Sequence, residues 1–158
     1  MGIVKLSKKS EYAIRALVCL AAPEAPAMLS IQEIARRERI PKKFLEQVLL
    51  ALNRAGLVQS IRGKAGGYVL RGTAAAVTLG DIVRAVDGPV ALLPCASLDA
   101  PVKCADCVSA ERCWLRPVMV DVGVAMNAAL EQVTLAEMTR RAALSRRSRE
   151  AQALMYEI

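Results

Sequence analysis

The chain has 158 residues, of which 54% are hydrophobic and 3% aromatic, so it can form one domain with a core of Ala, Val, Leu and Ile, and packed helices suit this composition better than a β-sandwich. It has neither a basic-then-apolar signal pattern nor an apolar run long enough to cross a bilayer, so we expect a cytoplasmic protein with no membrane partner. The net charge of +7 is uneven, because residues 1–88 hold 14 Lys and Arg against 7 Asp and Glu while residues 89–158 hold 8 of each, which is typical of a solvated basic surface or of a protein that binds nucleic acid.

Two helices are expected in the first forty residues. From Ser10 to Ala22 the apolar residues recur at helical spacing, and Pro23 ends the segment. After a short connection rich in Pro and Ala, Ser30 and Glu33 form a capping box at the start of "SIQEIARRERI". This box predicts a second, shorter helix.

A third helix and a hairpin follow. Pro41 suits the first turn of a helix, and the apolar pattern predicts that this helix continues through Ala55 and ends at Gly56. The runs "LVQSI" and "GYVL", joined by "RGKAGG", predict a β-hairpin with a basic, glycine-rich tip. The third helix has one apolar face, formed by Phe44, Leu45, Val48, Leu49 and Leu52.

This order of elements predicts a winged helix-turn-helix domain over residues 1–88, in which the third helix enters the major groove of double-stranded DNA and the hairpin is the wing. Lys42 and Lys43 lie at the start of this helix, where base edges and phosphates are usually contacted. On the wing, Arg62 and Lys64 can reach a narrow minor groove. Three wing glycines allow the backbone to approach phosphate, although a tight turn alone also explains them: Gly63, Gly66 and Gly67.

Glu46 on the third helix has two interpretations. It can be an exposed residue that pairs with Lys42, four positions earlier. Alternatively, its carboxylate can accept a hydrogen bond from the amino group of cytosine. We prefer the second interpretation because Lys42, Lys43 and Glu46 share one face at helical spacing.

The second half of the chain changes in composition. The short helix expected in "TLGDIVRAVDG" ends at Gly88, residues 89–115 form a cysteine-rich loop, and Pro117 begins a long helix within residues 116–158. A second capping box in "TLAEMTRR" precedes the Arg-rich tail "SRRSRE", which we expect to be a frayed helix or disordered. The long helix carries an apolar stripe that favours pairing with a second copy: Val118, Val122, Ala125, Met126, Ala129 and Val133. The predicted architecture is therefore mostly α, with a winged domain and a long dimerisation helix.

Four of the five cysteines lie in the loop with the spacing C-x8-C-x2-C-x5-C: Cys95, Cys104, Cys107 and Cys113. An odd number of cysteines in a reducing compartment argues against a disulfide framework. Thiolates are the ligands that iron–sulfur clusters need, and four of them can also hold tetrahedral zinc. Free thiols are the third possibility. The remaining cysteine, Cys19, is expected to be a small core residue of the first helix.

The run "LEQVLLALNRAGLVQSIRGKAGGYVL", the loop cysteines and "TLAEM" after a long helix resemble the family of winged-helix regulators that includes IscR, NsrR and RirA. The resemblance covers nearly the whole chain. It implies a bacterial transcription factor, such as a repressor, that binds a palindromic operator as a homodimer and is not an enzyme. It also implies an iron–sulfur cluster of two or four irons that senses redox state, iron or nitric oxide and controls operator affinity. The alternatives are a zinc-stabilised or metal-independent regulator and a protein-binding adaptor.

The resemblance also implies a ligand set, from which this sequence departs. The IscR pattern is C-x5-C-x5-C with a histidine three residues after the last cysteine, and here Cys107 and Cys113 alone keep that spacing. Arg116 stands at the histidine position and cannot ligate iron. Cys95 is the implied first ligand, reached by a longer loop. Two groups compete to be the fourth ligand: Cys104, and Glu11, which aligns with the carboxylate that NsrR-like members contribute from the opposite subunit.

A cluster between the winged domain and the long helix suggests a mechanism in which its oxidation or loss changes the angle between two recognition helices. The main rival is an enzyme or redox carrier with catalytic cysteines. The sequence has no histidine to act as a base, no nucleotide-binding glycine fingerprint and no thioredoxin-like βαβ context, so this rival is disfavoured.

Overall fold

The computed structural model describes residues 6–26, 28–63, 66–104, 107, 109 and 111–156. These residues form a mostly α-helical chain with one β-hairpin, which confirms the expected fold class. The elements in chain order are α1 (Lys8–Ala21), α2 (Ile31–Glu38), α3 (Lys42–Arg54), β1 (Val58–Ile61), β2 (Gly67–Leu70), α4 (Leu79–Asp87), the short 3-10 helix η1 (Pro94–Ala96), α5 (Leu115–Gln132) and α6 (Leu135–Tyr156).

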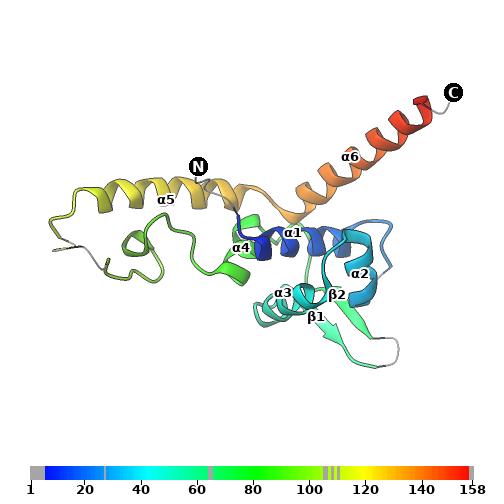
Figure 1. The fold of residues 1–158 in the computed structure, drawn as a ribbon, viewed down its shortest axis with the longest axis horizontal. Coiled ribbons are helices and arrows are strands. Elements are labelled where there is room, and N and C mark those ends of the chain that lie inside the picture. The colour runs from blue at the N-terminus through cyan, green and yellow to red at the C-terminus, as the bar shows by residue number, and fades with distance from the viewer. Residues whose placement is uncertain are drawn as a thin grey trace.

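Helix α1 is the centre of the molecule and packs against α2, α3, α4 and α6. Figure 1 shows α2, α3 and the hairpin on one side of α1, with the hairpin projecting away from the helices. Helices α5 and α6 lie on the other side and diverge, so that α5 extends over the cysteine-rich loop. The hairpin and the long helix α5 therefore lie on opposite sides of α1.

Side-chain caps fix the starts of α1, α2 and α4. Ser7 accepts a hydrogen bond from the backbone N–H of Ser10 at the start of α1. The capping box expected at α2 is present, because Ser30 accepts from the Glu33 backbone while the Glu33 carboxylate accepts from the Ser30 backbone. Thr78 begins α4 with another capping box, in which Asp81 supplies the carboxylate. Such caps satisfy N–H groups that have no partner within the helix.

The core is built from aliphatic side chains of both halves of the chain. Removing these side chains from water is the main favourable term for such a fold. Leu135, at the start of α6, is as deeply buried as the residues of α1 and α3. The largest fully buried side chains are Leu17, Leu29, Ile34, Leu45, Leu49, Leu52, Ile82 and Leu135.

The start of α6 is tied to the winged domain by backbone hydrogen bonds. The Leu135 N–H donates to the Val77 carbonyl over 2.8 Å, and the Leu79 N–H donates to the Val133 carbonyl over 2.8 Å. The chain thus leaves the winged domain after α4, passes through the loop and α5, and returns to the domain at α6.

The hairpin is a two-stranded antiparallel sheet in which Val58 pairs with Leu70 and Ile61 with Gly67. Leu29, which precedes α2, adds a bridge by exchanging two backbone hydrogen bonds with Tyr68. A Cβ atom at Gly67 would lie 2.6 Å from the Leu29 carbonyl oxygen. Glycine is therefore required at residue 67 by the packing of the wing on the helices.

Two helices differ in detail from the sequence expectation. Helix α5 begins at Leu115, so Pro117 lies within its first turn, where a missing N–H removes no helical hydrogen bond. The Arg-rich tail is a continuous helix through Tyr156. None of the helices that the structure describes is long and apolar enough to span a membrane.

Candidate DNA interface and cysteine-rich loop

The candidate recognition helix, α3, buries one face and exposes the other. Its buried residues are Leu45, Val48, Leu49 and Leu52, which fixes the orientation of the helix in the core. The exposed face carries Lys42, Lys43 and Glu46, the three residues selected from the sequence on this helix. The structure therefore brings them together on one solvent-facing surface.

Phe44 does not belong to the buried face, and its assignment to the apolar core face is wrong. Its side chain is 54% exposed, and its ring meets the ring of Tyr12 edge-on, with 6.4 Å between the ring centroids. Residue 44 is in the first turn of α3, next to the exposed Lys42 and Lys43. An exposed aromatic ring thus lies beside the lysines of the candidate interface.

Glu46 makes no ion pair with Lys42 among the residues that the structure describes. Its carboxylate is exposed and available to a ligand. Gln47, which follows it, is also exposed and lies one helical turn after Lys43. The sequence reading missed Gln47, although its i+4 spacing from Lys43 could have identified it.

The wing presents Arg62 at its exposed tip. Gly63 has a φ of 126°, a backbone conformation that strongly favours glycine, and a Cβ there would meet no neighbouring atom. A Cβ at Gly66 would lie 2.5 Å from the Ile61 carbonyl oxygen, so glycine is required there by the turn. Lys64, also expected to contact DNA, lies outside the described residues.

The cysteine-rich loop lies beneath the start of α5 (Figure 1). All five cysteines of the chain have free thiols. Cys95 is buried in η1, whereas the other three loop cysteines are half-buried. Cys19 is 4% exposed and belongs to the core, as expected.

The loop thiols form two pairs. The neighbouring Cys104 thiol raises the pKa of Cys95, and burial adds to this effect. The Cys107 thiol is likewise a neighbour of the Cys113 thiol, next to the start of α5. The pKa of Cys113 is lowered, first by the backbone N–H of Arg116, then by that of Leu115. The free amides at the first turn of α5 therefore favour the Cys113 thiolate.

Arg116 joins the two ends of this loop. Its Nε donates a hydrogen bond to the carbonyl oxygen of Cys95 over 3.0 Å, and its backbone N–H points to Cys113. The residue at the family's histidine position thus contacts the loop without offering a ligand atom to iron. It brings a fixed positive charge to the loop sulfurs.

The donor set fits an iron–sulfur cluster in kind, because four thiols from one loop and an adjacent helix start are soft ligands of the required number. Within the described residues, however, no three Cys, Asp or Glu side chains converge on one metal position. The pairs Cys95–Cys104 and Cys107–Cys113 are the units from which a four-thiolate site can be assembled.

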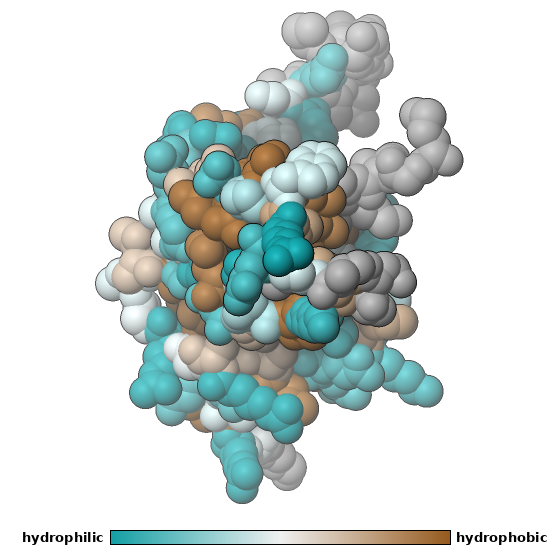
Figure 2. Space-filling view, turned by 90° about the vertical axis from the view of Figure 1, so that its left-hand side faces the viewer, coloured by the Kyte–Doolittle hydropathy of each residue, from teal (hydrophilic) through white to brown (hydrophobic). Residues whose placement is uncertain are grey.

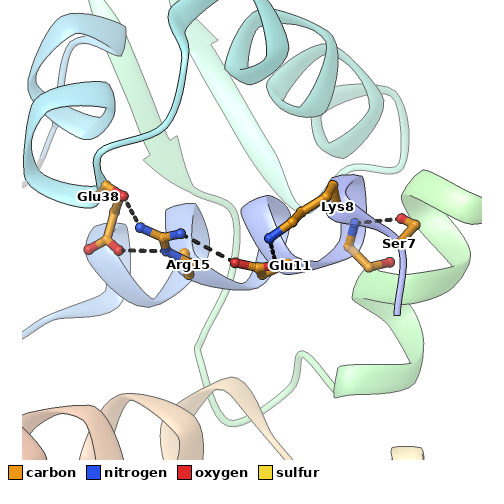
Figure 3. A network of polar contacts seen from close by, with 6 residues as sticks. Ser7, Lys8, Glu11, Arg15 and Glu38 are labelled. Atoms are coloured by element: carbon orange, nitrogen blue, oxygen red, sulfur yellow. Dashed lines mark hydrogen bonds and ion pairs between the residues drawn. The ribbon is translucent and has the colours of Figure 1, made fainter. Parts of the chain in front are cut away.

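Glu11, the other candidate ligand, is on α1 and faces a row of charges. Its carboxylate pairs with the Lys8 ammonium at 2.6 Å and with Arg15 at 3.5 Å (Figure 3). The hydrogen bond from Lys8 lowers the pKa of Glu11. This carboxylate is not grouped with the loop cysteines of its own chain.

The start of the long helix and the loop expose several large apolar side chains. Figure 2 views the molecule from the end where α5 begins and shows hydrophobic surface on this face, interrupted by hydrophilic side chains. Trp114 is 78% exposed, and Leu98 and Val102 of the loop are 59% and 60% exposed. On α5, Val118 and Val122 of the predicted apolar stripe are exposed. An apolar surface of this kind marks an interaction site.

Comparison with known proteins places these features in context. Residues 6–141 match the family model Rrf2, described as an iron-dependent transcriptional regulator. An rrf2-like HTH-type transcriptional regulator of Rhodobacter capsulatus is 40% identical over 136 residues, which cover 84% of this chain and 91% of that protein. The HTH-type transcriptional regulator IscR of Vibrio atlanticus is 31% identical over 137 residues, covering 87% of this chain and 76% of that protein.

Two solved structures share the fold. The structure of CymR, the global cysteine regulator of B. subtilis, has a TM-score of 0.66 and 30% sequence identity, and the match covers 88% of this chain and 98% of that one. The structure of T. potens IscR has a TM-score of 0.63 and 30% identity, with 88% of both chains covered.

Proposed function

The chain belongs to the Rrf2 family of transcriptional regulators, and from this premise we propose that it binds a palindromic operator as a homodimer whose affinity is controlled by an iron–sulfur cluster in the cysteine-rich loop. The family consists of regulators that bind DNA rather than enzymes. The observation that carries the proposal is the placement of two thiol pairs in the loop next to the start of α5, the helix that also carries exposed apolar side chains.

DNA recognition is assigned to the exposed face of α3 and to the wing. Lys42 and Lys43 offer positive charge to phosphates and base edges at the N-terminal end of the helix, and Arg62 does so on the wing. Glu46 and Gln47 offer hydrogen-bonding groups to bases, the carboxylate to cytosine and the amide to adenine. The contribution of Gly66 and Gly67 is to shape the wing, since a side chain at either residue would meet a backbone carbonyl.

Dimerisation is assigned to α5. Its exposed valines and the nearby Trp114 are not covered by any other part of the described chain. Covering them with the same surface of a second copy buries apolar area on both partners, and two-fold symmetry then matches a palindromic operator.

The cluster is assigned to the two thiol pairs, Cys95–Cys104 and Cys107–Cys113. Glu11 of a second subunit competes with Cys104 to be the fourth ligand. When bound, an iron–sulfur cluster supplies a redox-active group that oxidants or nitric oxide can alter. The residues of this chain contribute its attachment: η1 holds Cys95 in a buried position, and the first turn of α5 stabilises the Cys113 thiolate. Both ends of the site are attached to α5, because Arg116 of α5 donates to the Cys95 carbonyl oxygen and Cys113 lies just before the helix.

The test begins with protein purified without oxygen. We expect a brown or red protein whose iron and acid-labile sulfide are stoichiometric, and operator affinity that changes when the metal is removed by a chelator. Operators can be selected from a pool of random duplexes. Zinc in place of iron, with colourless protein, would contradict the cluster and leave DNA binding intact.

Two cysteine variants sharpen the test. Cys107→Ala removes a loop thiol and is expected to abolish both the iron content and the metal-dependent change in operator affinity. Cys19→Ala is the matched control because it replaces a core cysteine outside the loop. A Cys107→Ala protein that keeps its iron and its response would refute the assignment.

A further inference from the structure

A cavity of about 940 Å³ lies between α1, the end of α2 and α6. None of its lining residues belongs to α3, so the cavity is separate from the DNA-recognition face. In Figure 1 the hairpin and α6 project to opposite sides of α1. Its lining is strongly basic, with six arginines and the carboxylate of Glu38. The six are Arg15, Arg37, Arg39, Arg141, Arg146 and Arg149.

Three of these arginines are held by carboxylates. In Figure 3, Arg15 bridges α1 and the end of α2, where its guanidinium contacts both the side chain and the backbone carbonyl of Glu38. Such pairs fix the guanidinium groups in place and leave part of their hydrogen-bonding capacity unused. The pairs are Arg15 with Glu11 and Glu38, Arg141 with Glu137, and Arg146 with Glu24.

The other three, Arg37, Arg39 and Arg149, make no ion pair among the described residues. The cavity therefore carries more positive charge than its neighbouring carboxylates neutralise. Several guanidinium groups turned toward one space repel each other unless an anion lies between them. The excess charge favours a ligand with more than one negative charge.

Arg39 is held in an unusual backbone conformation. It follows the last residue of α2 and has a φ of 51°. All the other described residues with a positive φ are glycines. Glycine is the usual choice for such a helix end, and a side chain there costs about 1 kcal/mol. An arginine at this strained position suggests that its side chain serves the cavity.

The remainder of the lining is apolar. This apolar part is formed by Ile14 and Val18 of α1 and by Met138 and Ala142 of α6. A volume of about 940 Å³ is at the upper end of the range of small-molecule sites, and it accommodates a ligand of nucleotide size. Planar guanidinium groups match the oxygens of a phosphate, and the apolar wall suits an aromatic ring.

We propose that this cavity binds a small phosphorylated ligand of nucleotide size, with its phosphates on Arg37, Arg39 and Arg149 and its ring against the apolar wall between α1 and α6. The ligand would connect α6 to the end of α2 without covering α3. Its binding is therefore compatible with bound DNA, and it depends neither on the cysteines nor on a cluster.

The experiment uses the full chain and mant-ATP, which is ATP with a fluorescent group on the ribose. Saturable fluorescence anisotropy is expected, together with displacement by unlabelled ATP and by inorganic tripolyphosphate. Arg39→Gly and Arg149→Ala should each raise the Kd at least about tenfold, because each removes a charge-assisted hydrogen bond. Arg147→Ala is the matched control, since this arginine is on α6 but lines a different hollow, and it should leave the Kd within about twofold.

Two further measurements distinguish a loss of ligand binding from misfolding of the variants. Arg39→Gly replaces a strained residue by the one that this conformation favours, so its thermal midpoint should be equal to or above that of the parent chain. Operator binding without nucleotide should be unchanged in both cavity variants, which separates this proposal from the proposed function. The proposal is overturned if mant-ATP does not saturate, if both cavity variants bind it normally, or if Lys43→Ala abolishes its binding while they do not.

Discussion

The guanidinium of Arg84 on α4 lies 2.6 Å from the carboxylate of Glu131 on α5. The other oxygen of Glu131 accepts a hydrogen bond from the Thr78 hydroxyl over 2.7 Å, and Arg84 also pairs with Asp81. This network connects the last turn of the long helix to the start and the middle of α4. It is the polar link between the helix proposed to form the dimer and the domain proposed to bind DNA.

Glu131→Gln removes the charge of this link while it keeps the shape of the side chain. We expect a loss of about 0.5 to 1 kcal/mol in the free energy of unfolding, because the pair is partly exposed and solvent weakens it. Urea denaturation measures this loss. Asp121→Asn on the same helix is the control, since Asp121 makes no ion pair among the described residues and should leave the stability unchanged. Equal stability of Glu131→Gln and the parent chain would show that the link contributes nothing.

The same pair predicts a pH dependence. The hydrogen bond from Arg84 lowers the pKa of Glu131 below its ordinary value of 4.5. A carboxyl group with a lowered pKa in the folded state stabilises that state fully above its ordinary pKa and loses this contribution as the pH falls through the lower, folded value. We therefore expect the thermal midpoint to decrease as the pH is lowered below 4.5, and to decrease less in Glu131→Gln. Parallel pH profiles for the two proteins would contradict the assignment.

Gly67→Ala is expected to destabilise the wing. The new methyl group would lie 2.6 Å from the Leu29 carbonyl oxygen, so the bridge between Leu29 and Tyr68 must open. We expect a stability loss of about 2 kcal/mol or more, measured by thermal denaturation, and weaker DNA binding. Gly123→Ala on α5 is the control, because a Cβ there meets no atom within 4 Å and alanine favours a helix.

The recognition face predicts two different mutant behaviours. Lys42→Ala should weaken binding to all duplexes and reduce the slope of log affinity against log salt by about one, because a phosphate contact is lost. Glu46→Ala should relax the preference for one base pair, by about 1 to 3 kcal/mol, with little change in the salt slope. Anisotropy titrations with operator and mutated duplexes at several salt concentrations distinguish the two. Loss of specificity in Lys42→Ala with an unchanged slope would reverse these roles.

Much of the fold follows from local sequence. The capping box of Ser30 and Glu33, the glycine after α3 and the two apolar runs around "RGKAGG" each have one favoured local structure, and the elements appear where these signals predict them. The cysteine spacing likewise predicts a thiol-rich site next to α5. Phe44 shows the limit of periodicity, which gives the apolar face of a helix but not which residues of that face the rest of the chain covers.

By itself, the sequence determined most of the helices, the hairpin, the charge of the first half and the chemistry of the loop, because caps, turns and apolar periodicity act over a few residues. The tertiary structure alone decided which distant groups meet. It paired Arg84 with Glu131, brought Arg116 to the Cys95 carbonyl, and gathered arginines of three helices around one cavity. These contacts join residues far apart in the chain, and their geometry is set by the packing of whole helices, which no local pattern specifies.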